Sequence, residues 1–557
     1  MLKKIIIGMI LIGVVFVFAI VGAKKWLPSF EKVDPLTYFD EFKEGQINLV
    51  FEDQRIAMDK PVMQIDGELY LSFEFAKKYV DNTLYYDEKE DVITITSPRE
   101  VIRLYVDAHT ANLNFGQIEV EKPIKKIGTM SYIPYSLLSE RYGLNVAKGK
   151  DGRLYVAERQ SNKKTVASVR RKAAIRTHPN KKTLIVDTAE KDSQVTLYNK
   201  EGNFFRARSE NGIIGYLPAS SIQNIQEISP QDMKIIEPVP EINPLSEKVR
   251  LVWDQVENKT NANWNDTKYG RIKGANVISP TWFEFEDENG TLMDKATRQY
   301  VLDAHSKELR VWALMSHNFS KPELTKQILC STQKRQYVIS QLAEKSQQYG
   351  FDGINIDIEN IQAEFGEEWV QFMRELYPQM RELGITVSVD VYVPSNWSMH
   401  YERGKVSEVV DYFIVMAYDE HWSGSENAGS VASLSWVEEG IKKTLNEVPK
   451  EKLVLGIPFY TRIWEESDGV LKSSAYSMKA VEDIVNRWGI EPSYDADTGQ
   501  YYVEREKNNI LYKVWIENED SMKKRVDLIN KYNLQGYACW KLGLETGGIW
   551  DQLGKMQ

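Results

Sequence analysis

The C-terminal half of the chain alternates short apolar runs with amphipathic segments, and this rhythm constrains its fold more than any other feature. Helical patterns stand between several of the runs, as at 368–383 and 436–448. Eight strands separated by helices predict a closed (β/α)8 TIM barrel over residues 248–557. Residues 469–518 interrupt the rhythm between the last two runs, and there we expect a small α+β insertion. The eight runs are "VRLVW", "ANVISPTW", "LRVWALM", "GINIDIE", "TVSVDVYV", "YFIVMAY", "LVLGIPF" and "GYACW".

Length and composition restrict the classes of protein that remain. A chain of 557 residues exceeds the ~250–300 residues at which one core stops growing, so it contains several domains. The formal net charge of -10 argues against nucleic acid as the main partner. The two cysteines, Cys330 and Cys539, exclude a disulfide framework and a cysteine-rich zinc site. The histidines lack ligand spacing and no phosphate loop is present, so neither a metal nor another cofactor is expected.

The N-terminus predicts a membrane anchor over residues 1–26. Two lysines precede an uncharged apolar run at 5–23, and two more follow it. Nineteen residues at ~1.5 Å each nearly span a ~30 Å hydrocarbon core, whereas a secretory signal usually has a shorter apolar region. We therefore expect a single-pass protein of the cell membrane with its body outside the cytoplasm. Secretion after signal cleavage is the alternative.

Residues 48–158 contain an internal repeat. "IDGELYLSFEFAKKY" at 65–79 recurs as "IGTMSYIPYSLLSERY" at 127–142, and each copy leads into a strand. This duplicated α+β unit resembles the N-terminal stalk domain of bacterial copper amine oxidases. The resemblance implies a spacer or attachment role and no copper chemistry.

Residues 168–224 predict a small all-β domain, because strand-like runs alternate there with turn formers. Its ending, "NGIIGYLPASSI", resembles the last hairpin of a bacterial SH3-like domain, which implies binding to cell-wall peptides or glycans. The basic stretch 148–182 is either a solvated face or a site of attraction to anionic wall polymers. A proline-dotted linker at 225–247 separates this domain from the barrel.

The fourth β-run, in "FDGINIDIEN", carries acids where a buried strand would not be expected to have them. Ile354, Ile356 and Ile358 alternate with Asn355, Asp357 and Glu359. Side chains alternate with period two, and both faces of a barrel strand are buried, so the polar set points into the lumen. Glu359 falls at the C-terminal end, the face on which barrel active sites lie.

The spacing of the two acids favours one type of glycoside chemistry. Positions i and i+2 lie roughly 6.5 Å apart on the same strand, so the pair cannot readily flank a glycosidic bond from opposite sides. It suits a retaining mechanism in which the sugar's own 2-acetamido oxygen attacks the anomeric carbon. Asp357 would orient the acetamido group and stabilise the oxazolinium ion. Glu359 would protonate the leaving oxygen and then deprotonate water.

These residues resemble the signature of glycoside hydrolase family 18, Asp-Gly-x-Asp-x-Asp-x-Glu. "VMAYDE" (415–420), "GIPFYTRIW" (456–464) and "GYACWKLG" resemble further motifs of that family, in the same order. The resemblance implies that Tyr418 is catalytic through a hydrogen bond to the acetamido oxygen. It also implies substrate contacts by Met416, Asp419, Tyr460, Arg462 and Trp540. Trp282 and Trp422 follow other strands and are expected either to stack on sugars or to pack in the core.

One position departs from the signature. The middle acid of the family is Asn355 here, which can donate a hydrogen bond to Asp357 but cannot share its proton. The loss of a like charge should leave Asp357 ionised more readily. Asp352 matches the first acid of the signature, but its parity places it off the Glu359 face, so we expect a supporting role.

The predicted function is therefore an O-glycosyl hydrolase of the β-N-acetylglucosaminidase or chitinase type. The expected partner is an N-acetylglucosamine-containing glycan, and the modules before the barrel favour peptidoglycan. A chitinase-like hydrolase of chitooligosaccharides is the second candidate. A catalytically silent wall-binding lectin is the third, kept open by Asn355.

Overall fold

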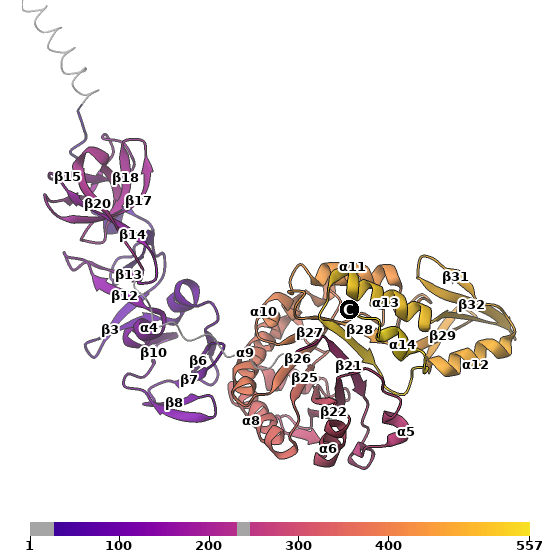
Figure 1. Ribbon diagram of the computed structural model, residues 1–557. Helices are drawn as coiled ribbons and strands as arrows, with labels where there is room; N and C mark the ends of the chain where they lie inside the picture. Colours follow the sequence, from indigo (N-terminus) through magenta and orange to yellow (C-terminus); the bar gives the residue numbers. More distant parts are fainter. Residues whose placement is uncertain (1–26, 231–244) are drawn as a thin grey trace, which may run out of the picture. The chain divides into compact units, whose positions relative to one another are not determined.

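The computed structural model describes residues 27–230 and 245–557 (Figure 1). The expected anchor at 1–26 lies outside the described residues, as does most of the expected linker at 225–247. Within the described ranges, no helix combines the length and the apolar character needed to cross a membrane. The described residues divide into two compact units, one with 27–85, 104–111 and 118–230, the other with 86–103, 112–117 and 245–557.

The repeat around Gly67 and Gly128 forms two hairpins that share one sheet. The strand order is β10-β11-β4-β3, and the second strands of the two hairpins pair antiparallel at its centre. Both turn glycines have positive φ, 84° and 64°, a conformation that side chains with a Cβ rarely adopt. The elements are β3 (Val62–Ile65), β4 (Glu68–Ser72), α3 (Phe73–Phe75), η1 (Ala76–Val80), β10 (Lys125–Ile127), β11 (Met130–Pro134) and α4 (Tyr135–Tyr142).

Two further sheets complete this region. One has the order β12-β13-β1-β2 and the other β5-β6-β7-β8-β9. Their strands are β1 (Asn48–Phe51), β2 (Gln54–Arg55), β12 (Leu144–Lys148) and β13 (Leu154–Arg159) in the first, and β5 (Tyr85–Asp87), β6 (Val92–Thr96), β7 (Val101–Tyr105), β8 (Thr110–Leu113) and β9 (Gly116–Glu119) in the second.

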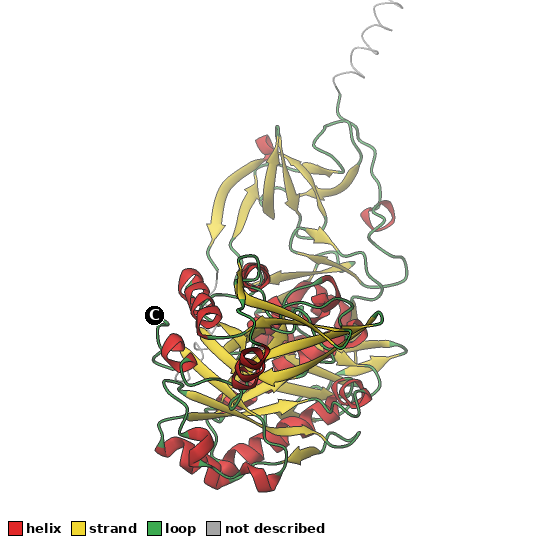
Figure 2. Cartoon of the chain, turned by 90° about the vertical axis from the view of Figure 1, so that its right-hand side faces the viewer, coloured by secondary structure: helices red, strands yellow, loops and turns green. Residues whose placement is uncertain are grey.

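The all-β part is one antiparallel sheet of seven strands that begins at Lys164, before the expected start at 168. Figure 2 shows it as strands with little helix. Its apolar core includes Val50 and Leu154 of the preceding sheet, so the two share a core. The strands are β14 (Lys164–Val169), β15 (Ala173–Arg176), β16 (Ile185–Ala189), β17 (Gln194–Glu201), β18 (Phe204–Arg208), β19 (Ile214–Pro218) and β20 (Ile222–Ile228).

The predicted barrel is confirmed: eight parallel strands close into one sheet through the pairing of β21 with both β22 and β34. All eight coincide with the apolar runs of the sequence. Figure 1 shows the labelled strands inside a ring of helices that includes α6, α8, α9, α10 and α11. The strands are β21 (Val249–Asp254), β22 (Val277–Phe285), β24 (Arg310–Ser316), β25 (Gly353–Asp357), β26 (Thr386–Tyr392), β27 (Tyr412–Met416), β28 (Leu453–Pro458) and β34 (Gly536–Trp540), with β23 (Leu292–Asp294) added antiparallel to β22.

Two apolar clusters hold the barrel together. The larger lies between strands and helices and contains Ile354, Ile356 and Ile358, none of which is exposed. The smaller fills the lumen, where Trp312 stacks on Tyr412 at 5.2 Å. The covering helices are α6 (Arg298–Ser306), α7 (Glu323–Leu329), α8 (Thr332–Tyr349), α9 (Gly366–Glu382), α10 (Arg403–Ser407), α11 (Leu434–Thr444), α13 (Glu519–Tyr532) and α14 (Ile549–Leu553).

The insertion follows directly after β28, earlier than the expected position 469. It is a five-stranded antiparallel sheet with one helix, and it has its own apolar cluster around Val481 and Val514. Its elements are β29 (Tyr460–Ser467), β30 (Val470–Ser477), α12 (Met478–Trp488), β31 (Ser493–Asp495), β32 (Gln500–Lys507) and β33 (Ile510–Ile516).

A buried ionic triad ties residues of β7 to the helices of the barrel. Glu375 of α9 accepts hydrogen bonds from Arg103 of β7 at 2.7 Å and from Arg335 of α8 at 2.9 Å. All three side chains are fully buried. Burial alone would raise the pKa of Glu375, but the two guanidinium groups outweigh it and the pKa lies below its usual value. The stalk-like region is therefore more than a loose spacer, because part of its sheet belongs to the barrel's compact unit.

Replacing Glu375 by Gln should destabilise the protein by roughly 3–5 kcal/mol at neutral pH, because two guanidinium groups stay buried without a counter-charge. Since the folded pKa of Glu375 is depressed, its contribution is complete above the unfolded value near ~4.3 and disappears as the pH falls through the folded value. Urea unfolding of the purified protein at several pH values measures both effects.

The matched control is Asp527→Asn, which breaks an exposed pair with Lys523 on α13. Its expected cost is below about 0.5 kcal/mol. Equal losses in the two variants would contradict a special role of the triad.

Candidate active site

The strand β25 presents its polar residues to the lumen, as the alternation predicts. Asn355 is fully buried and Asp357 nearly so, whereas Glu359, just beyond the strand end, is half-buried at the mouth. The three isoleucines between them pack on the helix side. One strand thus carries the polar set from the barrel interior to its C-terminal rim.

The amide of Asn355 makes four hydrogen bonds with residues of three other barrel strands, of which only β26 is adjacent to β25. Its Oδ1 accepts from Trp253 Nε1 at 2.8 Å and from Ser279 at 3.2 Å. Its Nδ2 donates to Ser388 at 3.0 Å and to Asp390 Oδ1 at 2.8 Å. Because indole nitrogen can only donate, Trp253 sets the orientation of the amide. The expected hydrogen bond from Asn355 to Asp357 does not form. The amide donates to Asp390 instead.

Glu359 is positioned by bonds to its carboxylate and to its backbone. Tyr392 donates to its Oε2 at 2.6 Å, Tyr401 donates to its carbonyl at 2.5 Å, and its own N–H donates to His317 Nδ1 at 3.3 Å. Burial raises the pKa of Glu359 above its usual value, Asp419 adds to this, and the Tyr392 bond opposes it. A carboxyl with a raised pKa at the mouth of a cleft can serve as general acid near neutral pH.

Asp357 differs from the expectation that it ionises readily. Its Oδ1 is buried without a hydrogen-bond partner. Burial raises its pKa well above the usual value, and the neighbouring Glu359 and Asp390 raise it further. The expectation counted the like charge lost at position 355 but not the burial of Asp357, which is the largest cause of its raised pKa.

A cleft runs across the barrel mouth as two adjoining hollows on either side of Glu359. Glu359, Met416, Tyr418 and Asp419 line both of them. The larger hollow, of about 830 Å³, is lined by Tyr392, Trp397, Trp422 and Trp436 among others. The smaller, of about 560 Å³, includes Trp253, Phe319, Asp357, Asp390 and Trp540. An extended ligand can therefore pass over the acid on both sides.

Four predicted site residues that follow the sixth and seventh barrel strands differ in their distance from the cleft. Tyr418 and Asp419 line the cleft, while Tyr460 and Arg462 line neither hollow. Tyr460 instead donates to Asp419 Oδ1 at 2.5 Å, and Arg462 lies 3.9 Å from the same oxygen. Tyr460 and Arg462 thus position Asp419, and the expected substrate contacts of these two residues stay predictions.

Of the three tryptophans considered as sugar contacts, two line the cleft and one is buried in the core. Trp540 lines the smaller hollow, half-buried, with its ring 5.9 Å from that of Trp253. Trp282 corrects the expectation of a sugar contact: it is fully buried and packs edge-on against Tyr300 of α6 at 5.2 Å. A bulge between Thr281 and Phe283 in the pairing of β22 with β24 accompanies this position. Trp422 is 55% exposed and lines the larger hollow.

Asp352 lies before β25, at the end of the strand opposite to Glu359. Its Oδ2 accepts from the backbone of Val311, the second residue of β24, and is 2.8 Å from His305 Nε2 of α6. Asp411 makes the equivalent bond to Val387 of β26. Asp352 therefore supports the N-terminal rim of the barrel and takes no part in the cleft.

Sequence reasoning missed Asp390, Tyr392 and Trp397. A signal for the first two existed, since Ser388, Asp390 and Tyr392 alternate with valines in "TVSVDVYV" as the acids of β25 alternate with isoleucines. Trp397 lies in the short 3-10 helix η5 (Asn396–Tyr401), which no periodicity marks, and it is 60% exposed and lines the larger hollow.

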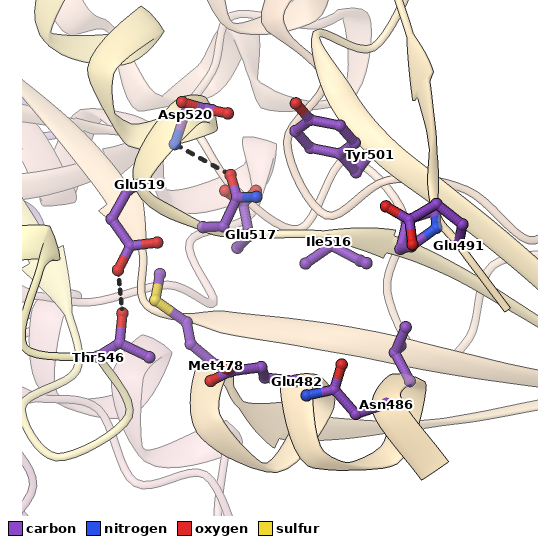
Figure 3. A pocket seen from close by; sticks show the side chains of 13 residues that line it. Met478, Glu482, Asn486, Glu491, Tyr501, Ile516, Glu517, Glu519, Asp520 and Thr546 are labelled. Carbon is purple, nitrogen blue, oxygen red and sulfur yellow. Dashed lines mark hydrogen bonds between the residues drawn. The ribbon is translucent and has the colours of Figure 1, made fainter. Parts of the chain in front are cut away.

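None of the residues of the insertion lines either hollow. The insertion instead encloses a separate hollow of about 520 Å³ against the start of α13 (Figure 3). Glu482 and Asn486 reach it from α12, and Glu519 accepts a bond from Thr546 at its edge. Within the described ranges, no group of three or more His, Cys, Asp or Glu side chains is arranged to hold a metal ion.

Comparison with known families agrees with this geometry. Residues 312–545 match the model of glycosyl hydrolases family 18, and residues 50–156 match that of the copper amine oxidase N-terminal domain. The barrel is therefore a family 18 glycosyl hydrolase domain that follows a copper amine oxidase N-terminal-like domain. The resemblances to glycoside hydrolase family 18 and to the copper amine oxidase N-terminal domain are thus confirmed, and the SH3-like resemblance stays a prediction.

Two curated relatives come from Bacillus subtilis (strain 168). The glycosylase YvbX is 25% identical over 295 residues, which cover 50% of this chain and 84% of the relative. A cortical fragment-lytic enzyme is 25% identical over 238 residues, which cover 41% of this chain and 55% of the relative. The chain thus spans most of the first relative and about half of the second.

A solved structure agrees with the fold. The C-terminal domain of a candidate chitinase from Desulfitobacterium hafniense DCB-2 superposes with a TM-score of 0.51 at 20% identity. The match covers 56% of this chain and 99% of that domain.

The two tryptophans should respond oppositely to truncation. Trp282→Ala should cost roughly 3–5 kcal/mol of stability and leave the affinity for an N-acetylglucosamine oligosaccharide unchanged, because the ring is in the core. Trp540→Ala should weaken that affinity with little loss of stability. Thermal unfolding and calorimetric titration on both variants, made with Glu359→Gln to prevent turnover, measure the two effects. Loss of affinity in a stably folded Trp282→Ala variant would contradict the assignment.

Proposed function

We propose that the protein hydrolyses β-linked N-acetylglucosamine in cell-wall peptidoglycan by a retaining, substrate-assisted mechanism. The observation that carries the proposal is the stacking of Asp357 and Glu359 on one barrel strand, with Glu359 at the mouth and Asp357 below it in the same cleft. Because Asp357 lies only two residues before Glu359 and faces the same cleft from below, we assign the role of nucleophile to the acetamido oxygen of the substrate.

Each residue has a distinct role in the proposed reaction. Glu359, with its raised pKa, gives its proton to the leaving oxygen as the acetamido oxygen attacks the anomeric carbon, and later takes a proton from water. Asp357 accepts the acetamido N–H and balances the positive charge of the oxazolinium ion. Tyr418 lies beside both acids and donates to the acetamido oxygen. Trp540 supports the apolar face of the reacting sugar.

The choice of peptidoglycan rests on relatives and on domain order. One relative is a cortical fragment-lytic enzyme, and a second B. subtilis protein, 28% identical over 245 residues, is named as a sporulation-specific glycosylase. We propose that the all-β domain is SH3-like and binds the cell wall. Hydrolysis of chitooligosaccharides is the second candidate, favoured by plant class V chitinases among the relatives, such as one from Medicago truncatula at 25% identity. A silent wall-binding lectin is disfavoured by the presence of Glu359.

The test compares the protein from residue 27 onward with its Glu359→Gln variant on purified peptidoglycan and on chitooligosaccharides. Loss of the acid should lower kcat by roughly 10²–10⁴-fold, while glycan binding persists. Glu364→Gln is the matched control, because this acid lies five residues on, is 55% exposed and pairs only with Lys326 at the surface. Mass spectrometry identifies the reducing ends.

Each product pattern has a defined meaning. New reducing N-acetylglucosamine ends from peptidoglycan that depend on Glu359 support the wall-lytic function. Cleavage of chitooligosaccharides alone supports the chitinase. Binding without turnover in the wild-type protein contradicts hydrolysis and supports the lectin.

We also propose that residues 1–26 anchor the protein in the cell membrane with the barrel outside. The apolar run between paired lysines supports this. Full-length protein should sediment with membranes and resist carbonate extraction, whereas the protein from residue 27 onward should not. A mature N-terminus near Lys24 in the culture medium would contradict anchoring and indicate secretion.

A further inference from the structure

Asp390 and Asp357 are neighbours on adjacent parallel strands. Asn355 pairs with Ser388 and Ile356 with Val389 in the register of β25 and β26. One more step along this register places Asp357 beside Asp390. Both side chains line the smaller hollow, and only 9% of Asp357 and 2% of Asp390 are exposed. Two carboxyl groups therefore share one nearly dry position in the lumen.

The surrounding residues donate a hydrogen bond to Asp390 but leave an oxygen of Asp357 without a donor. Asp390 Oδ1 receives the amide proton of Asn355, whose orientation Trp253 dictates. Asp357 Oδ1 has no partner although it is buried. A buried carboxylate without a donor is costly, and two adjacent carboxylates cannot both ionise in such a place. A single proton between the two carboxyls removes both problems.

We propose that Asp390 is a positioning residue that shares one proton with Asp357, and so replaces the acid that the family signature has at position 355. At neutral pH the pair carries one proton and one negative charge. When substrate binds, the shared proton moves fully to Asp390, and Asp357 is the anion that faces the acetamido group. No other proton moves, so the pair keeps one proton and one negative charge throughout. The inference rests on the proposed function for its catalytic consequence.

The electrostatics of the hollow agree with a shared proton. Burial raises the pKa of Asp390 well above its usual value, and Glu359 raises it further, against the bond from Asn355. Other titratable side chains face the same hollow, namely Glu359, Tyr418, Asp419, Glu257, Glu284 and Lys295. Tyr392, which donates to Glu359, stands beside them.

The experiment exchanges the acid and the amide. Asp390→Ala removes the donor to the Asp357 anion, so the acid limb of the kcat/KM profile should move up by about one pH unit, a tenfold loss at its foot. Asp390→Asn keeps a donor and should leave that limb near its original position. The double variant Asn355→Asp/Asp390→Asn places the acid where the signature has it and should recover most of the wild-type kcat. An unmoved acid limb in Asp390→Ala, or no recovery in the exchange, would overturn the proposal.

A second readout does not need activity. A buried acid with a raised folded pKa favours folding below its unfolded value near ~3.9, and this contribution is lost as the pH rises toward the folded value. The fall in Tm between pH 5 and pH 8 should therefore be smaller in Asp390→Ala and Asp390→Asn than in the wild type. If the wild-type protein cleaves no glycan, the proposed function fails, but this comparison still decides whether the pair shares a proton. Equal falls in all three proteins would exclude it.

Discussion

The site depends on one constraint: inside a closed barrel every polar group must find its partner among the neighbouring strands. Asn355 meets this constraint completely, with two donors and two acceptors for its amide. Its partners come from β21, β22 and β26, so the bonds also fix how these strands meet below the cleft. The orientation of Asp390, and through it the environment of Asp357, follows from the indole N–H of Trp253, which can only donate. The chemistry at the mouth therefore rests on a polar layer beneath it.

Period-two alternation carried most of what could be predicted. The apolar runs placed all eight strands, and the alternation sent Asn355, Asp357 and Glu359 into the lumen, because side chains of a barrel strand alternate between its two buried faces. It could not tell which residue of β26 would lie beside Asp357, since that depends on the register of β25 with β26. Asp390 was overlooked for this reason. Trp282 was misplaced because β22 continues to Phe285, so this tryptophan lies within the strand and packs in the core.

Packing between segments far apart in the chain could not be predicted from the sequence pattern either. The repeat in 48–158 predicted a separate spacer, yet residues 86–103 and 112–117 group with the barrel. Arg103, Arg335 and Glu375 explain this, because a fully buried triad is stable only when all three members are present. Nothing local to any of the three residues marks them as partners. The insertion shows the same limit: its α+β character was readable, but its distance from the cleft was not.

The count of acids in the cleft bears on whether Asn355 marks a silent site. The family signature places three acids on the lumen side of its fourth strand, and this chain has two of them, Asp357 and Glu359. Asp390 on the neighbouring strand brings the number of these acids back to three, and it accepts a hydrogen bond from Asn355, which stands where the family has its third acid. A binding protein that had lost its chemistry would have no need for this compensation, because burying another carboxyl costs stability and contributes nothing to holding a neutral sugar. The exchange of acid and amide between two adjacent strands is therefore better explained by a site that still has to move a proton.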